Sequence, residues 1–267
     1  MTQAANNEAL VLRSDDGGIA TLTLNRPDNY NTLSTPLMLE LKSHLAALGE
    51  DTSIRVVVIT GAGKAFCAGH DLNEMHADPS EAAMQKMFAL CTDNMMAMTH
   101  LPQPVIAKVN GVAAAAGCQL VAQCDLAIAA DHAKFGTSGI NVGLYCSTPS
   151  VPVTRNLGRK QAMELLMTGD MIPASQAQDW GLINRTVPAE QLDDAVQEMA
   201  AKIASKSPDA VALGKDLFYR QLEEGMDAAY QRAGQAITCN MQSVSTRKAI
   251  DSFLGKAPPP DWPDRSN

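Results

Sequence analysis

The sequence lacks the features that mark several classes of protein. It has no run of about 18 uncharged apolar residues, so neither a membrane-spanning helix nor a membrane partner is predicted. The first residues, MTQAANNEALVLR, hold no apolar segment and one arginine, so neither a secretory signal nor a transit peptide is expected. The 21 basic residues are outnumbered by 29 acidic ones, and the resulting net charge of −8 argues against a nucleic-acid partner.

Cysteines are also few, and their spacing is not that of metal ligands. Because no secretory signal is seen, we expect them to be free thiols in a reducing compartment, and we predict a cytoplasmic protein. No metal site and no resident cofactor is predicted. The six cysteines are Cys67, Cys91, Cys118, Cys124, Cys146 and Cys239.

What is present is a large apolar fraction, 46% of 267 residues, arranged in alternating strand-like and helical segments. A hairpin pattern at 9–24 opens a series of short apolar runs and amphipathic stretches that continues to residue 187. This alternation indicates an α/β core over residues 1–187. From Pro188 on, three helical segments at 189–205, 208–224 and 226–254 are predicted, so residues 188–267 are expected to form a helical region.

The stretch QPVIAKVNGVAAAAGCQ, residues 103–119, is the most informative part of the chain. A short apolar strand ends at Asn110-Gly111, and small residues lead through Gly117 into an apolar helix. A helix N-terminus presents free N–H groups with a partial positive charge, where a developing oxyanion would be stabilised. Gln119 is placed about one turn into that helix.

A second junction of small residues, Cys67-Ala68-Gly69-His70-Asp71, has the same character. Two backbone donors that converge on one point make an oxyanion hole, a device suited to thioester or enolate chemistry. Taken alone, such glycine- and alanine-rich loops usually reflect only tight packing of the chain.

Together these stretches resemble the enoyl-CoA hydratase/isomerase (crotonase) family. The matching segments run in family order from residue 18 to 256, and within the family GHDL and AAGCQLVAQCD are similar to the mitochondrial enoyl-CoA hydratase domain-containing proteins. The segments are NRPDNYNTLS, VVVITGAGKAFCAGHDL, PVIAKVNGVAAAAGCQLVAQCDLAIA, FGTSGINVGL, LLMTGDMIPASQAQDWGLINRTVP and FLGK.

The resemblance implies a spiral of ββα units whose C-terminal helices form a homotrimer, or a dimer of trimers. It implies that an acyl-CoA thioester is the substrate or ligand. The oxyanion hole would consist of the N–H groups of His70 and Ala116. The residues expected to bind substrate or coenzyme A are Arg26, Asp28, Tyr30, Ala68, Asp71, Leu72, Gly117 and Tyr145, with Phe253 and Lys256 reaching a neighbouring subunit's coenzyme A.

Two departures from the family pattern bear on the reaction. Gln119 and Gly139 stand where a hydratase of this family has its glutamates. Hydration needs one group to take a proton from water and another to deliver one to carbon, and neither an amide nor glycine does this. The expected activity is therefore hydratase- or isomerase-like but weak or altered. Alternatives are a non-catalytic acyl-CoA-binding protein and a coenzyme A thioester hydrolase in which Gln119 positions water.

Other polar residues near these positions are candidates for a direct role in proton transfer or nucleophilic attack. Histidine ordinarily titrates near neutral pH, so the side chain of His70 is a candidate acid or base, although the family uses the backbone there. Tyr145, Cys146 and the two residues after them follow the position of the missing glutamate and are candidates to line the pocket. A nucleophilic Cys146 would need a nearby base or cation.

Overall fold

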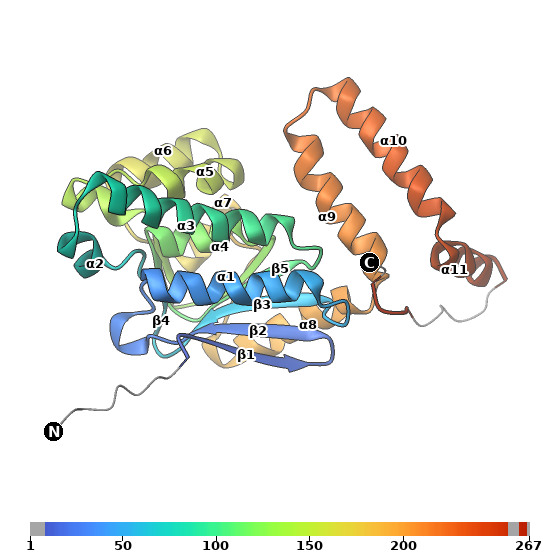
Figure 1. Cartoon of the computed structure of the whole chain (residues 1–267), viewed down its shortest axis with the longest axis horizontal. Helices are drawn as coiled ribbons and strands as arrows, with labels where there is room; N and C mark the ends of the chain where they lie inside the picture. Colours follow the sequence, from blue (N-terminus) through green and yellow to red (C-terminus); the bar gives the residue numbers. More distant parts are fainter. Residues whose placement is uncertain (1–8, 256–261, 266–267) are drawn as a thin grey trace.

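The computed structural model of the chain describes residues 9–255 and 262–265, and Figure 1 shows its α/β body and its helical C-terminal part. The main sheet has six strands in the order β1-β2-β3-β5-β7-β10. The first two form the expected antiparallel hairpin, and the other neighbours are parallel. The strands are β1 (Val11–Asp16), β2 (Ile19–Leu24), β3 (Val56–Gly61), β5 (Val105–Val109), β7 (Leu126–Ala130) and β10 (Arg185–Val187).

A smaller sheet of four short strands lies beside the first, in the order β4-β6-β8-β9. The chain passes repeatedly from the main sheet to the small one, from β3 to β4, from β5 to β6 and from β7 to β8, and then into helices. This repetition is the predicted spiral of ββα units. The short strands are β4 (Ala65–Cys67), β6 (Val112–Ala114), β8 (Lys134–Gly136) and β9 (Ile172–Pro173).

The helices of the body start where the sequence provides caps and apolar faces. The Ser34 hydroxyl accepts from the Leu37 N–H at the start of α1, and Pro36 occupies its first turn. The helices are α1 (Thr35–Glu50), α2 (Leu72–Ala77), α3 (Glu81–His100), α4 (Ala116–Gln123), α5 (Ser147–Asn156), α6 (Arg159–Thr168), α7 (Ala174–Trp180) and α8 (Leu192–Ala204), with short 3-10 turns at Pro27–Asn29, Ser138–Val142 and Ala189–Gln191.

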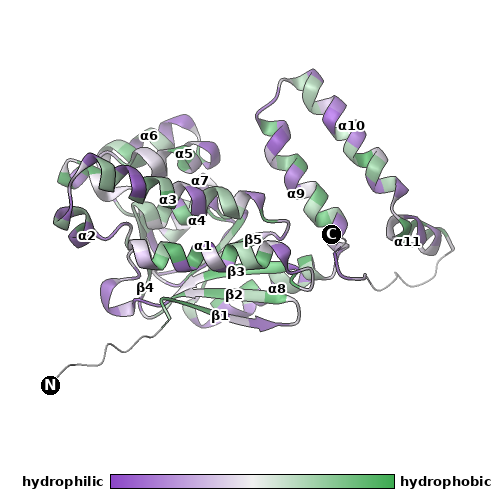
Figure 2. Cartoon of the chain, in the orientation of Figure 1, coloured by the Kyte–Doolittle hydropathy of each residue, from purple (hydrophilic) through white to green (hydrophobic). Residues whose placement is uncertain are grey.

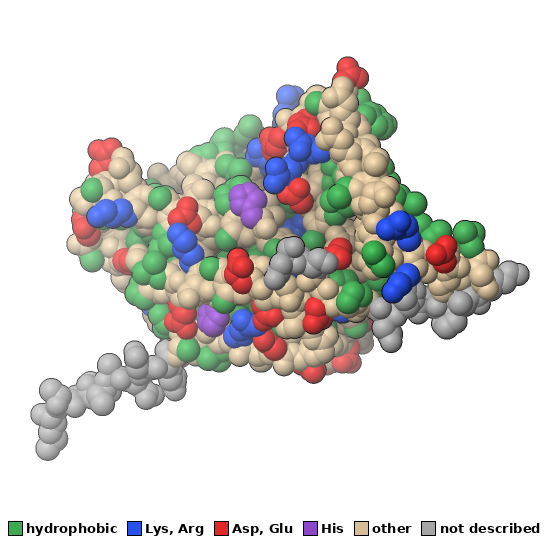
Figure 3. All heavy atoms as spheres, turned by 45° about the vertical axis from the view of Figure 1, so that its right-hand side comes forward, with side chains coloured by type: hydrophobic (Ala, Val, Ile, Leu, Met, Phe, Trp, Pro, Cys, Tyr) green, Lys and Arg blue, Asp and Glu red, His purple; other side chains and the backbone are tan. Residues whose placement is uncertain are grey.

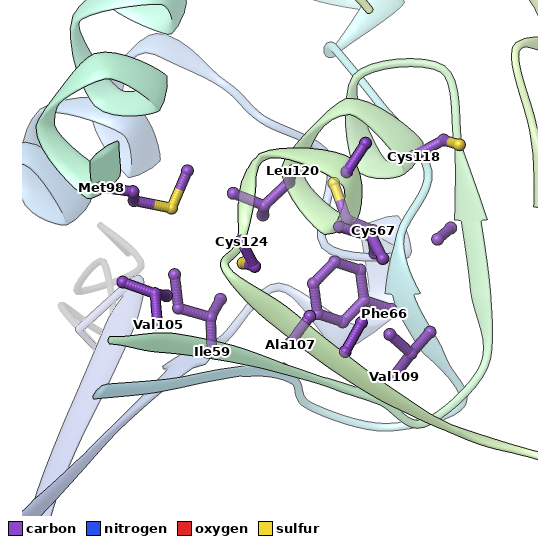
Figure 4. Close-up of a cluster of buried hydrophobic side chains, with 14 of the residues drawn as sticks. Ile59, Phe66, Cys67, Met98, Val105, Ala107, Val109, Cys118, Leu120 and Cys124 are labelled. Carbon is purple, nitrogen blue, oxygen red and sulfur yellow. The ribbon is translucent and has the colours of Figure 1, made fainter. Parts of the chain in front are cut away.

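Buried apolar residues form a core on each face of the main sheet. The larger one joins α1, α3 and α4 to the strands, and Figure 4 shows Phe66 and Cys67 beside Cys118 and Leu120 in it. The smaller one packs Leu192 and Val196 of α8 against the opposite face. In Figure 2 the hydrophobic colouring accordingly runs along the central strands. The small sheet contacts α4 through β4 and β6, and the two junctions of small residues lie there.

The C-terminal part continues as α9 (Pro208–Leu222), α10 (Met226–Gln242) and α11 (Val244–Gly255). These three helices extend from the body as an arm (Figure 1). The single helix predicted over 226–254 is wrong, because the chain leaves helical geometry at Ser243, whose φ and ψ are −60° and 135°. The Ser243 and Ser245 hydroxyls hydrogen-bond at 2.7 Å, a local contact that competes with helix continuation. The domain boundary at residue 188 stays a prediction.

Candidate functional site

A cavity of about 770 Å³ opens between the loop after β2, the end of β4, the start of α4 and the segment before α5. This volume is in the range of sites for small organic ligands. Most of its lining is apolar or weakly polar. The lining residues are Asp28, Asn29, Tyr30, Thr32, Ala68, His70, Asp71, Leu72, Asn73, Met75, Phe88, Ala115, Ala116, Ser138, Gly139, Val142, Leu144, Tyr145, Cys146, Ser147, Thr148 and Pro149.

The two small-residue junctions predicted from the sequence meet at the floor of this cavity. A Cβ atom on Gly117 would lie 2.0 Å from the Cys67 carbonyl oxygen. A Cβ atom on Gly69 would lie 3.0 Å from the Ala115 Cβ atom and 3.2 Å from the Ala116 nitrogen. Only glycine permits backbone approaches this close. The small residues therefore bring residues 69–71 against the start of α4.

The N–H groups of His70 and Ala116 are left without a role in secondary structure. His70 forms a parallel bridge with Leu33, but the hydrogen bonds of that bridge come from the Leu33 N–H to Gly69 and from the Asp71 N–H to Leu33. Ala116 is the first residue of α4, so its N–H has no partner inside the helix. Both residues line the cavity. The geometry thus suits two donors to one ligand oxygen.

Backbone strain marks the same place. Ala115 precedes α4 with φ 48° and ψ −116°, a region that residues other than glycine rarely occupy. Such a conformation costs on the order of 1–3 kcal/mol and persists where the surrounding fold imposes it. Here the Ala115 N–H donates to the Gly136 carbonyl of β8 at 2.8 Å. This bond helps to hold the turn that presents the next N–H, that of Ala116.

His70 lines the cavity, as does Phe88. Its ring meets Phe88 of α3 edge to face, with centroids 5.3 Å apart and planes at 88°. Burial lowers the pKa of His70 to about 4, with Glu74 opposing the shift. The ring is therefore neutral at pH 7. Its Nε2 atom is buried and has no hydrogen-bond partner in the part of the chain that the structure describes.

Gln119 lies in the first turns of α4 and is 3% exposed. Its Oε1 atom accepts a hydrogen bond of 3.3 Å from the Thr148 hydroxyl, and Thr148 lines the cavity. Gln119 itself is just behind the lining. An amide held in this way can orient a polar group of a ligand through a neighbouring hydroxyl, but it does not transfer protons.

The space beside the Cα atom of Gly139 is already occupied by other atoms. A Cβ atom there would lie 2.6 Å from the Leu144 carbonyl oxygen and 2.9 Å from the Cys146 sulfur. The segment from 139 to 146 therefore fills the space through which a longer side chain would leave the backbone. Burial raises the pKa of the Cys146 thiol, so the sulfur is a neutral thiol rather than a nucleophilic thiolate.

The loop after β2 is tied to the oxyanion junction by an ion pair. The Arg26 Nη1 atom lies 3.0 Å from the Asp71 Oδ2 atom and also donates to the carbonyl oxygen and hydroxyl of Thr32. Partial burial by itself would raise the pKa of Asp71. Arg26 and the Asn73 N–H outweigh this effect and keep the pKa of Asp71 below its usual range. Arg26 does not line the cavity and acts here on the protein itself.

The remaining predicted site residues are distributed as follows. Asp28, Tyr30, Ala68, Leu72 and Tyr145 line the cavity together with Asp71, His70 and Ala116. Gly117 lies behind the lining, packed on Cys67. Phe253 is on α11, 82% exposed, and does not line the cavity. Lys256 lies outside the described residues.

Five apolar lining residues were not predicted as part of the site: Met75, Phe88, Val142, Leu144 and Pro149. Phe88 lies at the edge of the apolar face of α3. Its partners Met87 and Cys91 are buried in the core, whereas Phe88 is half-buried. A position at the edge of that face was the available sign that it could reach a neighbouring cavity.

Within residues 9–255 and 262–265, the requirements of a metal site and of a membrane-spanning helix are not met. No group of three histidine, cysteine or acidic side chains there is arranged to hold a metal ion. No helix in the same residues is long and apolar enough to span a bilayer.

Comparison with known proteins identifies similar sequences. The model of the enoyl-CoA hydratase/isomerase family matches residues 14–265. The chain is 41% identical over 242 residues to mitochondrial enoyl-CoA hydratase domain-containing protein 3 of Rattus norvegicus, covering 91% of this chain and 81% of the relative. It is 38% identical over 259 residues to the protein of the same name from Danio rerio, covering 97% and 90%.

Solved structures agree with these relatives. A structure described as enoyl-CoA hydratase from Mycobacterium smegmatis superposes with a TM-score of 0.94 at 50% identity, covering 95% of this chain and 99% of the other. Human enoyl-CoA hydratase domain-containing protein 3 gives 0.91 at 39% identity, covering 94% and 99%. The predicted α/β crotonase-type fold and the predicted subgroup are both confirmed.

The prediction of a cytoplasmic location is wrong in the light of these relatives, which are named as mitochondrial proteins. The prediction rested on unpaired cysteines, and all six are indeed free. Free thiols indicate a reducing environment, but they do not distinguish between the compartments that provide one.

Proposed function

The chain belongs to the enoyl-CoA hydratase/isomerase family, and we propose that it binds acyl-CoA thioesters in the cavity while hydrating enoyl-CoA poorly. The thioester carbonyl oxygen would accept hydrogen bonds from the N–H groups of His70 and Ala116. Two preorganised donors stabilise the negative charge that develops on this oxygen when the α-carbon loses a proton or a nucleophile adds to the β-carbon. The approach of the two junctions at Gly69 and Gly117 supports this placement.

The observation that carries the proposal of weak hydration is the packing at Gly139. The glutamate of the family pattern is absent there, and the Leu144 carbonyl and the Cys146 sulfur occupy the space next to the Cα atom. Gln119 replaces the other glutamate and accepts a hydrogen bond from Thr148. Because each proton-transfer group contributes about 10²–10⁴-fold, loss of both removes most hydratase activity.

The nucleotide end of coenzyme A would lie at the rim formed by the loop of residues 26–30. Tyr30, which is 48% exposed, lies on this rim. The Lys64 Nζ atom is 4.9 Å from the centre of the Tyr30 ring. This cation supplies local positive charge for phosphates on a chain whose net charge is −8. Lys256 and Phe253 of a neighbouring subunit would complete the site.

A homotrimer, alone or stacked as a dimer of trimers, is proposed on the strength of the arm formed by α9, α10 and α11. Large apolar side chains are exposed along it, as Figure 3 shows, and such a surface is typical of a protein interface. Light scattering after gel filtration should give three or six times the chain mass of 28.4 kDa. A monomer would contradict this assembly. The exposed residues are Phe218, Leu222, Met226, Tyr230, Ile237, Met241, Val244, Ile250, Phe253 and Leu254.

Two measurements test the proposed function. Titration calorimetry with butyryl-CoA should show binding, and free coenzyme A should bind more weakly because it lacks the thioester carbonyl oxygen. Crotonyl-CoA hydration, followed by loss of enoyl absorbance, should be at least about 100-fold slower than with a hydratase that carries both glutamates. Turnover at a normal rate would contradict the importance of Gln119 and Gly139, and absence of all acyl-CoA binding would overturn the proposal.

The alternatives predict different results in the same assays. A non-catalytic acyl-CoA-binding protein would bind butyryl-CoA without changing any thioester. A thioester hydrolase, in which the pair of Gln119 and Thr148 positions water, would release free coenzyme A that a thiol reagent detects. The observation that favours thioester hydrolysis as an alternative is the Thr148 hydroxyl, which lies 3.3 Å from the Gln119 amide oxygen.

A further inference from the structure

His70 lines the cavity, and its imidazole has a buried nitrogen that the described side chains around it leave without a hydrogen bond. The Nε2 atom of the ring has no hydrogen-bond partner among the described residues and is fully shielded from solvent. A buried polar atom without a partner costs about 1–3 kcal/mol. The ring is nevertheless held edge to face against Phe88, so it is ordered without being satisfied. An ordered, unsatisfied group in a cavity wall points to a ligand.

His70 also carries one of the two free backbone donors of the site. If a thioester oxygen lies on the N–H groups of His70 and Ala116, the α-carbon is two bonds from that oxygen. The α-carbon is thereby placed beside the residue whose ring forms part of the same wall. Proximity of this kind is the main requirement for proton transfer.

The other polar groups of the cavity are unsuited to taking a proton from carbon. The Gln119 amide does not titrate in the useful range. The Cys146 thiol is kept protonated by burial. Asp71 is engaged by Arg26 and by the N–H of Asn73, and Asp28 lies on the rim loop with Tyr30. In contrast, the neutral ring of His70 has a free lone pair and the basicity of an ordinary carboxylate.

We propose that the His70 imidazole is the base that removes a proton from the α-carbon of a bound acyl-CoA thioester. The inference rests on the proposed acyl-CoA binding. The α C–H bond breaks and its proton passes to a ring nitrogen. The electron pair forms an enolate whose charge lies on the oxygen held by the two N–H groups. Return of a proton to the same carbon regenerates the thioester, and no oxidant, reductant or second substrate is consumed.

Deuterium exchange tests this step directly. The full-length protein is incubated with butyryl-CoA in D₂O, and mass spectrometry follows deuterium entering the α-position. Wild-type protein should exchange the α-protons well above the rate in buffer, and H70Q should lose about 100-fold or more. The glutamine keeps the backbone N–H and the polar volume but cannot take the proton. Calorimetry on the same samples should show butyryl-CoA affinity within a few-fold of wild type.

H132Q is the matched control. His132 is exposed and hydrogen-bonds only to the Asn110 carbonyl outside the cavity, so this variant should exchange at the wild-type rate. If H70Q does not fold, H70N provides the same contrast. Wild-type binding without exchange, or exchange in H70Q within threefold of wild type, would overturn the role of His70 while leaving acyl-CoA binding intact. Absence of binding to wild type would overturn the proposed function and this inference with it.

Discussion

The carbonyl oxygen of Cys67 lies 2.0 Å from where a Cβ atom of residue 117 would be. Strand β4 and helix α4 can approach this closely only because residue 117 is glycine. The contact sets the relative position of the two chain segments that carry the His70 and Ala116 N–H groups. We therefore expect ligand binding to depend on a residue that does not line the cavity.

Gly117→Ala should separate these segments. We expect a loss of about 1–3 kcal/mol in unfolding free energy from overpacking, and at least about a tenfold loss of butyryl-CoA affinity, equivalent to 1.4 kcal/mol. Chemical denaturation and calorimetry measure the two effects. Gly214→Ala in α9 is the control, since nothing lies within 4 Å of the added methyl group. It should stabilise the helix slightly, and wild-type affinity in Gly117→Ala would contradict the dependence.

Restoring the family's carboxylates should not restore hydration. The double variant Gln119→Glu with Gly139→Glu should hydrate crotonyl-CoA no faster than Gln119→Glu alone. The reason is that a side chain at 139 meets the Leu144 carbonyl at 2.6 Å and the Cys146 sulfur at 2.9 Å. Steady-state kinetics of the single and double variants decide the matter. A double variant at least tenfold faster than the single one would show that residues 139–146 rearrange readily.

The packing of the arm against the body should depend on Lys215, a buried lysine of α9. The Lys215 Nζ atom lies 2.7 Å from the Asp125 Oδ2 atom and donates to the carbonyls of Met98 and Gln103. Burial lowers the pKa of Lys215, and Asp125 opposes this shift. Lys215→Met should lose about 3–5 kcal/mol, because it leaves the Asp125 charge without its cation.

Exposed Lys160 on α6 provides the comparison for that variant. Lys160→Met should change the unfolding free energy by no more than about 0.5 kcal/mol. Urea denaturation of both variants, together with light scattering for assembly, would test the prediction. Equal stability of Lys215→Met and Lys160→Met would show that the buried ion pair does not hold the arm.

Stability should fall in mild acid because of His70. Burial lowers the pKa of His70 from 6.5 to about 4, and Glu74 opposes the change. As the pH falls through 6.5, the unfolded chain gains a proton that the folded chain takes up only near pH 4. The folded state is therefore destabilised progressively across this range, by on the order of 3 kcal/mol in total, and not further below it.

Comparison of wild type with H70Q isolates this contribution. The difference in unfolding free energy between the two proteins should shift in favour of H70Q as the pH is lowered from 7 to 4. Denaturation at several pH values measures it. A difference that does not change with pH would show that the ring has the same proton affinity in the folded and unfolded chains.

Much of the architecture could be predicted from local sequence. The hairpin and the end of β5 at Asn110-Gly111 follow from periodicity and turn chemistry. The break at Ser243 could not be predicted in this way, because helical spacing continues across it. Short side-chain hydrogen bonds decide such a break, and apolar periodicity does not report them.

The sequence by itself determined which chemical groups the site contains: small residues at two junctions, an amide at 119, no side chain at 139 and an imidazole at 70. Only the tertiary structure decided what surrounds each of them. Arg26 pairs with Asp71, the Cys146 sulfur and Leu144 carbonyl close off Gly139, and the His70 Nε2 atom has no hydrogen-bond partner among the described residues. These contacts join segments far apart in the chain, and packing across such distances depends on the whole fold rather than on local pattern.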